Sequence, residues 1–212
     1  MKFWLCLIAV LAAPTFSGCY DTLSSERPLI TEANQIQDDR VIGRYSFQQR
    51  DRHTDEYKDA GPQPEPMVSI HMNGPSYVMT VYQDDGEPLE AVMRLHPLAQ
   101  ADHYIMQVQC ENEKVCEKSE DRYASYYLVR VNPEGFYVSF FIYGPPPDES
   151  SVDGGLDDNL RNLLNRHGLT VVFVKPNYVL REPDLPRLRA FMEETLMAPG
   201  LSREFFFFKK LK

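Results

Sequence analysis

The middle of the chain alternates apolar and polar side chains between short turn signals, and this pattern restricts it to β-structure. Val68, Ile70 and Met72 alternate with polar residues, which is the period of a strand with one buried face. Residues 132–135 read Asn-Pro-Glu-Gly between two apolar runs, the composition of a tight turn. Because short connections join antiparallel neighbours, segment 41–143 is predicted to form a β-rich meander of about six to eight strands.

After a Pro- and Gly-rich linker at residues 144–155, the spacing of the apolar residues changes from every second residue to every third or fourth. Leucines three and four residues apart predict a helix that ends at Gly168, and Asp184 is placed to cap a second helix. An apolar run follows each helix. The predicted fold class is therefore α+β: the meander is followed by a helix-strand-helix-strand region, residues 156–212, packed on the sheet as one compact unit.

The last apolar run consists of four consecutive Phe residues, 205–208, followed by Lys-Lys-Leu-Lys. One interpretation is a segment that dips into the membrane interface with its lysines near the headgroups. The other is a strand buried on both faces. Four exposed Phe side chains would be an aggregation hazard, so the buried strand is the prediction.

The N-terminus has the layout of a secretory signal peptide. Lys2 is followed by an apolar run and then by small residues, and the run is shorter than the roughly 20 residues that span a bilayer. Residues 1–18 are therefore predicted to be a signal that is removed. The mature chain would then lack tryptophan, because Trp4 is the only one in the sequence.

The end of this segment, Phe16-Ser17-Gly18-Cys19, resembles the lipobox of bacterial lipoproteins, with Phe16 where Leu is usual. The resemblance implies that a diacylglycerol is attached to the Cys19 thiol and that the signal is cut just before this residue. Tyr20 rather than Asp follows it, which in lipoproteins of the enterobacterial type implies the outer membrane rather than the inner one. A cut by ordinary signal peptidase after Ser17 is the alternative.

The remaining cysteines suggest a crosslink. Residues 19–40 are polar and punctuated by turn-forming residues, so they are predicted to be a tether that leads into the fold, with Leu29 and Ile30 as the residues that could dock on it. Cys110 and Cys116 would stay unmodified after cleavage, and in the oxidising cell envelope they are predicted to form a disulfide bond. A metal site at this pair would need a second pair of ligands at usable spacing, which the sequence lacks.

The charge of the chain argues against several partners. Lys and Arg number 22 and Asp and Glu 31, giving a formal net charge of −9. Binding to nucleic acid is not expected, because phosphate contacts need clustered basic residues. Negative charge also opposes approach to anionic lipid, so membrane residence is expected to depend on the lipid anchor.

Sequence motifs of catalysis are missing. The sequence has no nucleophile elbow, no phosphate-binding Gly loop, no dinucleotide fingerprint and no His-Glu-x-x-His. His96 and His103 flank a loop beside Asp102, but a third metal ligand cannot be named, so they are interpreted as surface histidines. The protein is accordingly predicted not to be an enzyme and to use no metal or other cofactor.

Three functions remain open at this point. The first is a non-catalytic, lipid-anchored lipoprotein of the bacterial cell envelope that contacts another envelope protein, since both faces of the 126–143 hairpin are aromatic. The second is a calycin-like barrel for a small hydrophobic ligand, because Gly43-Arg44-Tyr45 is faintly similar to the Gly-x-Trp start of lipocalins. The third is an envelope hydrolase whose catalytic groups meet only in the fold.

Overall fold

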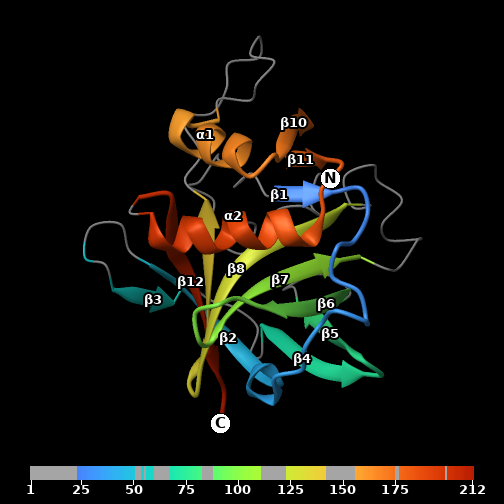
Figure 1. Ribbon diagram of the computed structural model, residues 1–212. Helices are drawn as coiled ribbons and strands as arrows, with labels where there is room; N and C mark the ends of the chain where they lie inside the picture. The colour runs from blue at the N-terminus through green and yellow to red at the C-terminus, as the bar shows by residue number, and fades with distance from the viewer. Residues whose placement is uncertain are drawn as a thin grey trace.

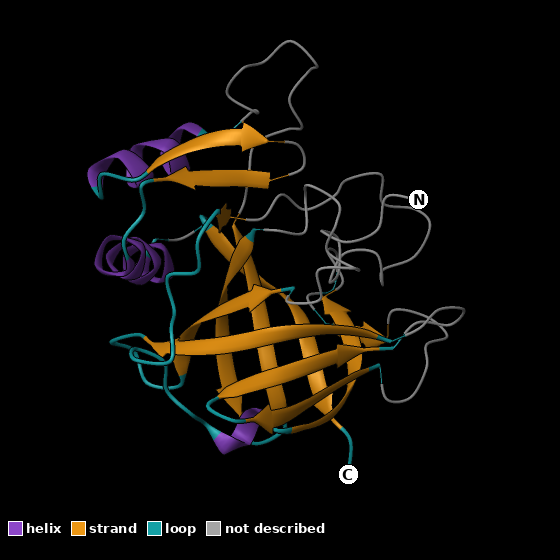
Figure 2. Cartoon of the chain, turned by 90° about the vertical axis from the view of Figure 1, so that its right-hand side faces the viewer, coloured by secondary structure: helices purple, strands orange, loops and turns teal. Residues whose placement is uncertain are grey.

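Eight antiparallel strands close into a barrel in the order in which they occur in the sequence (Figures 1 and 2). These strands are β2 (Gly43–Arg50), β4 (Val68–Asn73), β5 (Ser76–Val81), β6 (Leu89–Pro97), β7 (His103–Gln109), β8 (Ala124–Asn132), β9 (Gly135–Phe141) and β12 (Ser202–Lys210). β12 pairs with β9 on one side and with β2 on the other, which closes the barrel. The computed structural model describes residues 23–50, 54, 56–59, 67–82, 88–110, 123–141, 156–174, 177–198 and 200–212.

The closed barrel corrects the predicted fold class. The α+β prediction kept the meander open and packed the C-terminal strands on it with their helices. Instead, β12 enters the barrel between the first and last strands of the meander. An open sheet would leave two rows of unpaired backbone groups at its edges, and closure pairs these groups. The local elements are confirmed, because β4–β5 and β8–β9 are the hairpins that the turn signals predict.

Aromatic side chains fill much of the barrel interior. Phe136 and Phe208 stack with ring centroids 4.7 Å apart, and Tyr45 meets the edge of Phe136 at 5.1 Å. Phe47 contacts Phe206 at 4.6 Å. All five rings are at most 2% exposed. Because β-branched and aromatic side chains pack well on a pleated surface, this interior explains why the strands have their composition.

The outer face of β12 is covered as well. Phe207 stacks on Tyr137 of β9 at 4.5 Å, and Tyr57 meets both rings from the short strand β3 (Tyr57–Asp59), which pairs with β2. The Arg130 guanidinium lies 4.2 Å from the Tyr137 ring centre. The prediction of a strand buried on both faces is therefore confirmed at Phe206, Phe207 and Phe208, which are at most 6% exposed.

A second layer is inserted between β9 and β12 and lies outside the barrel (Figure 1). It consists of α1 (Asp158–Arg166), β10 (Thr170–Val174), β11 (Asn177–Arg181) and α2 (Leu185–Met197). The Asp184 side chain accepts a hydrogen bond from the first turn of α2, as predicted, and the Asp157 side chain, whose capping role was not predicted, does the same for α1. Leucines of α1 and Leu188, Phe191 and Met192 of α2 form an outer core against the barrel wall.

β8 belongs to both cores. Val129 and Val131 face the barrel interior, whereas Ala124, Tyr126 and Leu128 lie in the outer core. The first half of β8 pairs with the short strand β1 (Leu23–Ser25), and β1 continues the sheet to β11 and β10. The outer layer is thus hydrogen-bonded to the barrel as well as packed on it.

Candidate functional site

The segment that follows the predicted lipid-attachment residue is docked on the barrel wall. Cys19 lies outside the described residues, but Leu23 is 2% exposed, and β1 pairs antiparallel with β8 and parallel with β11. Residues 23–40 were expected to belong to a tether whose Leu29 and Ile30 dock on the fold. This docking is confirmed, because Ile30 is fully buried in the outer core, whereas β1, which completes a sheet, was not predicted.

Gln107 holds this segment to β7. Its side-chain oxygen accepts hydrogen bonds from the backbone N–H groups of Leu29 at 2.9 Å and Ile30 at 2.8 Å. Its amide nitrogen donates to the carbonyl oxygen of Ile30 at 3.1 Å. The side chain is 1% exposed, and a buried amide is tolerated only where such bonds compensate for lost water.

Tyr126 makes the second connection from the neighbouring strand. Its hydroxyl lies 2.7 Å from the Ser25 side-chain oxygen and accepts a hydrogen bond from the Leu29 N–H at 3.1 Å. Burial raises the pKa of the Tyr126 hydroxyl to about 12, so the group remains a neutral donor and acceptor at physiological pH. We call Ser25, Leu29, Ile30, Gln107 and Tyr126 the N-terminal clasp.

A separate polar cluster closes the opposite end of the barrel. The short 3-10 helix η1 (Asp39–Val41) crosses this end, and the Arg40 guanidinium lies 2.6 Å from one Asp38 carboxylate oxygen and 2.7 Å from Asp102. The Tyr104 hydroxyl donates to Asp38 at 2.9 Å. These contacts hold the Asp38 carboxylate in place, and the arrangement secures the end of the barrel rather than presenting a reactive group.

The interior of the barrel is the natural place to look for a ligand site. The hollow among Val41, Met93, Leu95, Met106, Val129, Val131 and Phe136 has no room for a water molecule. Side chains therefore fill this part of the interior, as in other barrels of about eight strands that enclose no cavity.

A hollow outside the barrel is larger. It has a volume of about 160 Å³ and lies between α1 and the β10–β11 hairpin, where Leu164, Leu169, Phe173 and Tyr178 form part of its wall. Most small-molecule pockets measure roughly 300–1,000 Å³, so this hollow is small for an organic ligand.

Three of the described histidines place a ring nitrogen against a carbonyl or carboxylate oxygen, such as His167 Nε2, which lies 2.7 Å from Glu194. The Nδ1 atoms of His96 and His103 face the carbonyl oxygens of Asn34 and Ala101, at 2.7 and 2.8 Å. Within the parts of the chain that the structure covers, no group of three or more His, Cys, Asp or Glu could hold a metal ion.

The predicted crosslink falls partly outside the described residues. Cys110 forms a disulfide bond, and its partner lies outside the residues that the structure describes, as does Cys116. The pairing of Cys110 with Cys116 therefore stays a prediction.

The sequence did not predict the roles of Gln107 and Tyr126 in the clasp. Gln107 stands at a polar position of an alternating strand, where a side chain is ordinarily expected to face solvent, and its partners are more than 70 residues away.

Among the described helices, none has the length and hydropathy to cross a bilayer. No protein-family model, curated protein or solved structure matches the chain.

Proposed function

We propose that the protein is a lipid-anchored lipoprotein of the bacterial cell envelope, on the outer membrane, whose barrel domain has a structural or protein-binding role and no catalytic one. The observation that carries this proposal is the lipobox-like sequence ending at Cys19, which follows a short apolar run. The clasp supports the proposal, because it gives the residues just after Cys19 a defined attachment to the fold.

The attachment point is close to the proposed lipid. Leu23 is the fourth residue after Cys19, and the four steps of chain between them span at most about 14 Å at full extension. A lipid on Cys19 would therefore hold the domain directly at the membrane surface instead of at the end of a long tether. Each buried methylene of the acyl chains contributes about 0.8 kcal/mol, so two or three chains suffice for stable anchoring.

The filled interior favours a function at the surface of the barrel. Met93, Met106 and Val129 are at most 2% exposed and close the space that a ligand inside this part of the barrel would need. The domain would then contribute its outer faces to contacts with another envelope protein. The described aromatic side chains of the 126–143 hairpin do not form such a face, because Tyr126, Tyr127 and Phe136 are at most 7% exposed and Tyr137 stacks on Phe207.

The anchor is tested with Cys19→Ser and a matched control, Cys6→Ser, in the full-length protein expressed in a bacterium. We expect the unsubstituted and Cys6→Ser proteins in the membrane fraction, with intact mass showing loss of residues 1–18 and addition of acyl chains. Cys19→Ser should carry no acyl chains. An unmodified Cys19 thiol in the unsubstituted protein, or Trp4 retained in its mature form, would contradict the proposal.

A second candidate is a calycin-like barrel that binds a small hydrophobic ligand. The closed barrel of eight antiparallel strands in sequence order favours it, whereas the packed hollow beside Phe136 counts against it. Displacement of a fluorescent fatty acid from the purified protein distinguishes the two. Saturable binding in a ratio of one to one would support the ligand binder, and no displacement would remove it.

A further inference from the structure

Among the strands that the structure describes, β10 forms one edge of the sheet. Val171 and Phe173 pack on the outer core, whereas Thr170, Val172 and Val174 point the other way and are exposed. Val172 and Val174 are 37% and 38% exposed. We call the outward side of Thr170, Val172 and Val174 the β10 face.

The β10 face is apolar where exposed apolar side chains are otherwise rare. Across the described parts of the chain, Met197 is the other large apolar side chain with comparable exposure. Edge strands usually carry charged residues or proline that discourage contact with other surfaces. β10 reads Thr-Val-Val-Phe-Val and has neither, so this edge is suited to an apolar contact.

The sheet places the β10 face near the proposed anchor. Leu23 of β1 is opposite Tyr178 of β11, and Tyr178 is opposite Phe173 of β10. Neighbouring strands lie about 4.8 Å apart, so Phe173 is about 10 Å from Leu23. With the four-residue lead, an acylated Cys19 would lie within about 24 Å of the valines on either side of Phe173.

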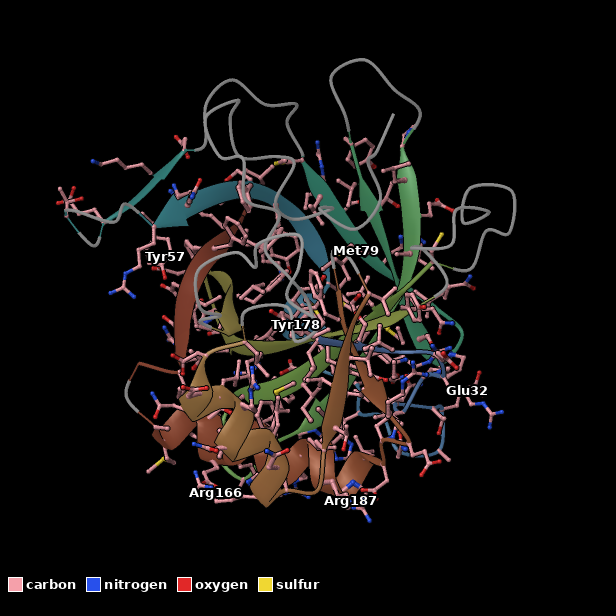
Figure 3. The ribbon with its side chains drawn as sticks, turned by 90° about the horizontal axis from the view of Figure 1, so that it is seen from above. Glu32, Tyr57, Met79, Arg166, Tyr178 and Arg187 are labelled. Atoms are coloured by element: carbon pink, nitrogen blue, oxygen red, sulfur yellow. The ribbon has the colours of Figure 1, made fainter. Side chains whose placement is uncertain are left out.

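The charge around this face differs from that of the rest of the chain. Residues 156–198, which contain α1, β10, β11 and α2, include six basic and six acidic residues, in a protein with a net charge of −9. Arg166, which points outward from α1 in Figure 3, pairs with Glu194 at 2.7 Å, and Arg181 approaches Glu26 to 3.8 Å. The region is therefore close to neutral, so repulsion from anionic headgroups is weaker here than elsewhere on the protein.

From these observations we propose that the β10 face rests in the interface of the lipid bilayer to which the protein is anchored. The inference rests on the lipid attachment at Cys19 proposed above. Apolar side chains can insert shallowly at a membrane surface where repulsion from the headgroups is weak. Two half-exposed valines add little affinity, so the contact orients the anchored domain, with the barrel extending away from the membrane.

The absence of tryptophan from the predicted mature chain provides a direct test. Val172→Trp introduces a single fluorescent reporter on β10, and His71→Trp places the control on an exposed position of β4. Each full-length lipidated variant is reconstituted into vesicles of phosphatidylethanolamine and phosphatidylglycerol. Part of the phospholipid carries brominated acyl chains, which quench tryptophan at the depth of the bromines.

We expect the Val172→Trp variant to lose most of its emission in brominated vesicles and the His71→Trp variant to keep its emission. Equal emission of the two variants would overturn the inference. A blue-shifted Val172→Trp emission without quenching, together with a doubled mass in detergent, would also overturn it, because it indicates pairing of β10 with a second copy of the chain.

Tryptophan itself favours membrane interfaces, so a second measurement uses the unsubstituted protein. Amide hydrogen exchange of residues 170–174 should slow on transfer from detergent to vesicles, while that of residues 71–73 should not. Unchanged exchange at β10 would contradict the inference. Two other measurements test the proposed lipid anchor independently of the β10 face. An uncleaved signal would give tryptophan emission in the unsubstituted protein, and mass spectrometry reports acylation of Cys19 directly.

Discussion

Gln107 is the residue on which the N-terminal clasp most depends. Gln107→Met keeps the volume but leaves the N–H groups of Leu29 and Ile30 without their acceptor. Leaving such buried groups unsatisfied costs about 1–3 kcal/mol in the free energy of unfolding. Urea denaturation should report this loss, and hydrogen exchange should show residues 23–36 opening first. Gln48→Met, at a side chain bonded only to Asp59 on the surface, should stay within about 0.5 kcal/mol of the unsubstituted protein.

Asp38 makes the stability of the closed end dependent on pH. Hydrogen bonds from Arg40 outweigh the opposing effect of burial and hold the pKa of the Asp38 carboxyl below its ordinary value of 3.8. Because the folded pKa is lower than the unfolded one, the ionised carboxylate stabilises the fold above about pH 4. This contribution is lost as the pH falls through the folded value.

The Asp38→Asn variant tests this dependence. The free-energy difference between it and the unsubstituted protein should be constant from about pH 7 to pH 5 and should shrink below pH 4. Denaturation at a series of pH values measures it, and Asp39→Asn, on an exposed side chain of the same turn, is the control. A difference that stays constant down to pH 2 would show that the Asp38–Arg40 contact is not formed in solution.

Elements held by local contacts could be predicted from the sequence, and those held by distant contacts could not. The cap at Asp184 and the β8–β9 hairpin depend on residues within one turn of chain, and each lies where its pattern predicts. The β2–β12 pairing joins Phe47 to Phe208, and no periodicity reports a partner so far along the chain. The same reason hid β1 and the clasp, whose polar residues resemble those of a solvated tether.

Gly135 of β9 lies so close to the closing strand β12 that there is no space for a side chain. A Cβ atom there would lie 1.9 Å from the carbonyl oxygen of Phe208 in β12. Gly135→Ala should therefore push β9 and β12 apart and destabilise the protein by at least about 3 kcal/mol. Gly74→Ala, at a turn with φ +60° and no atom within 4 Å of the added carbon, should cost about 1 kcal/mol. Similar melting temperatures for the two variants would contradict this account of the β9–β12 contact.

The barrel and the outer layer should unfold together, because β8 contributes one face to each core. Phe206→Ala in the barrel and Leu163→Ala in the outer core remove buried side chains and should each cost about 2–5 kcal/mol. Both should lower the midpoint of one cooperative transition, followed by circular dichroism in the far and near ultraviolet. Met197→Ala, at a side chain that is 78% exposed, should leave the midpoint unchanged. A Leu163→Ala protein with two separated transitions would show that the layers fold independently.

The position of β12 also governs when the molecule can be completed. Every other barrel strand precedes it in the sequence, and residues 142–201 intervene before it. The edges of the sheet at β2 and β9 cannot pair with β12 until this last strand has been synthesised. Folding that depends on pairing between such distant segments is intrinsically slow. If the chain is exported as proposed, the barrel would therefore close only after this last strand has crossed the membrane.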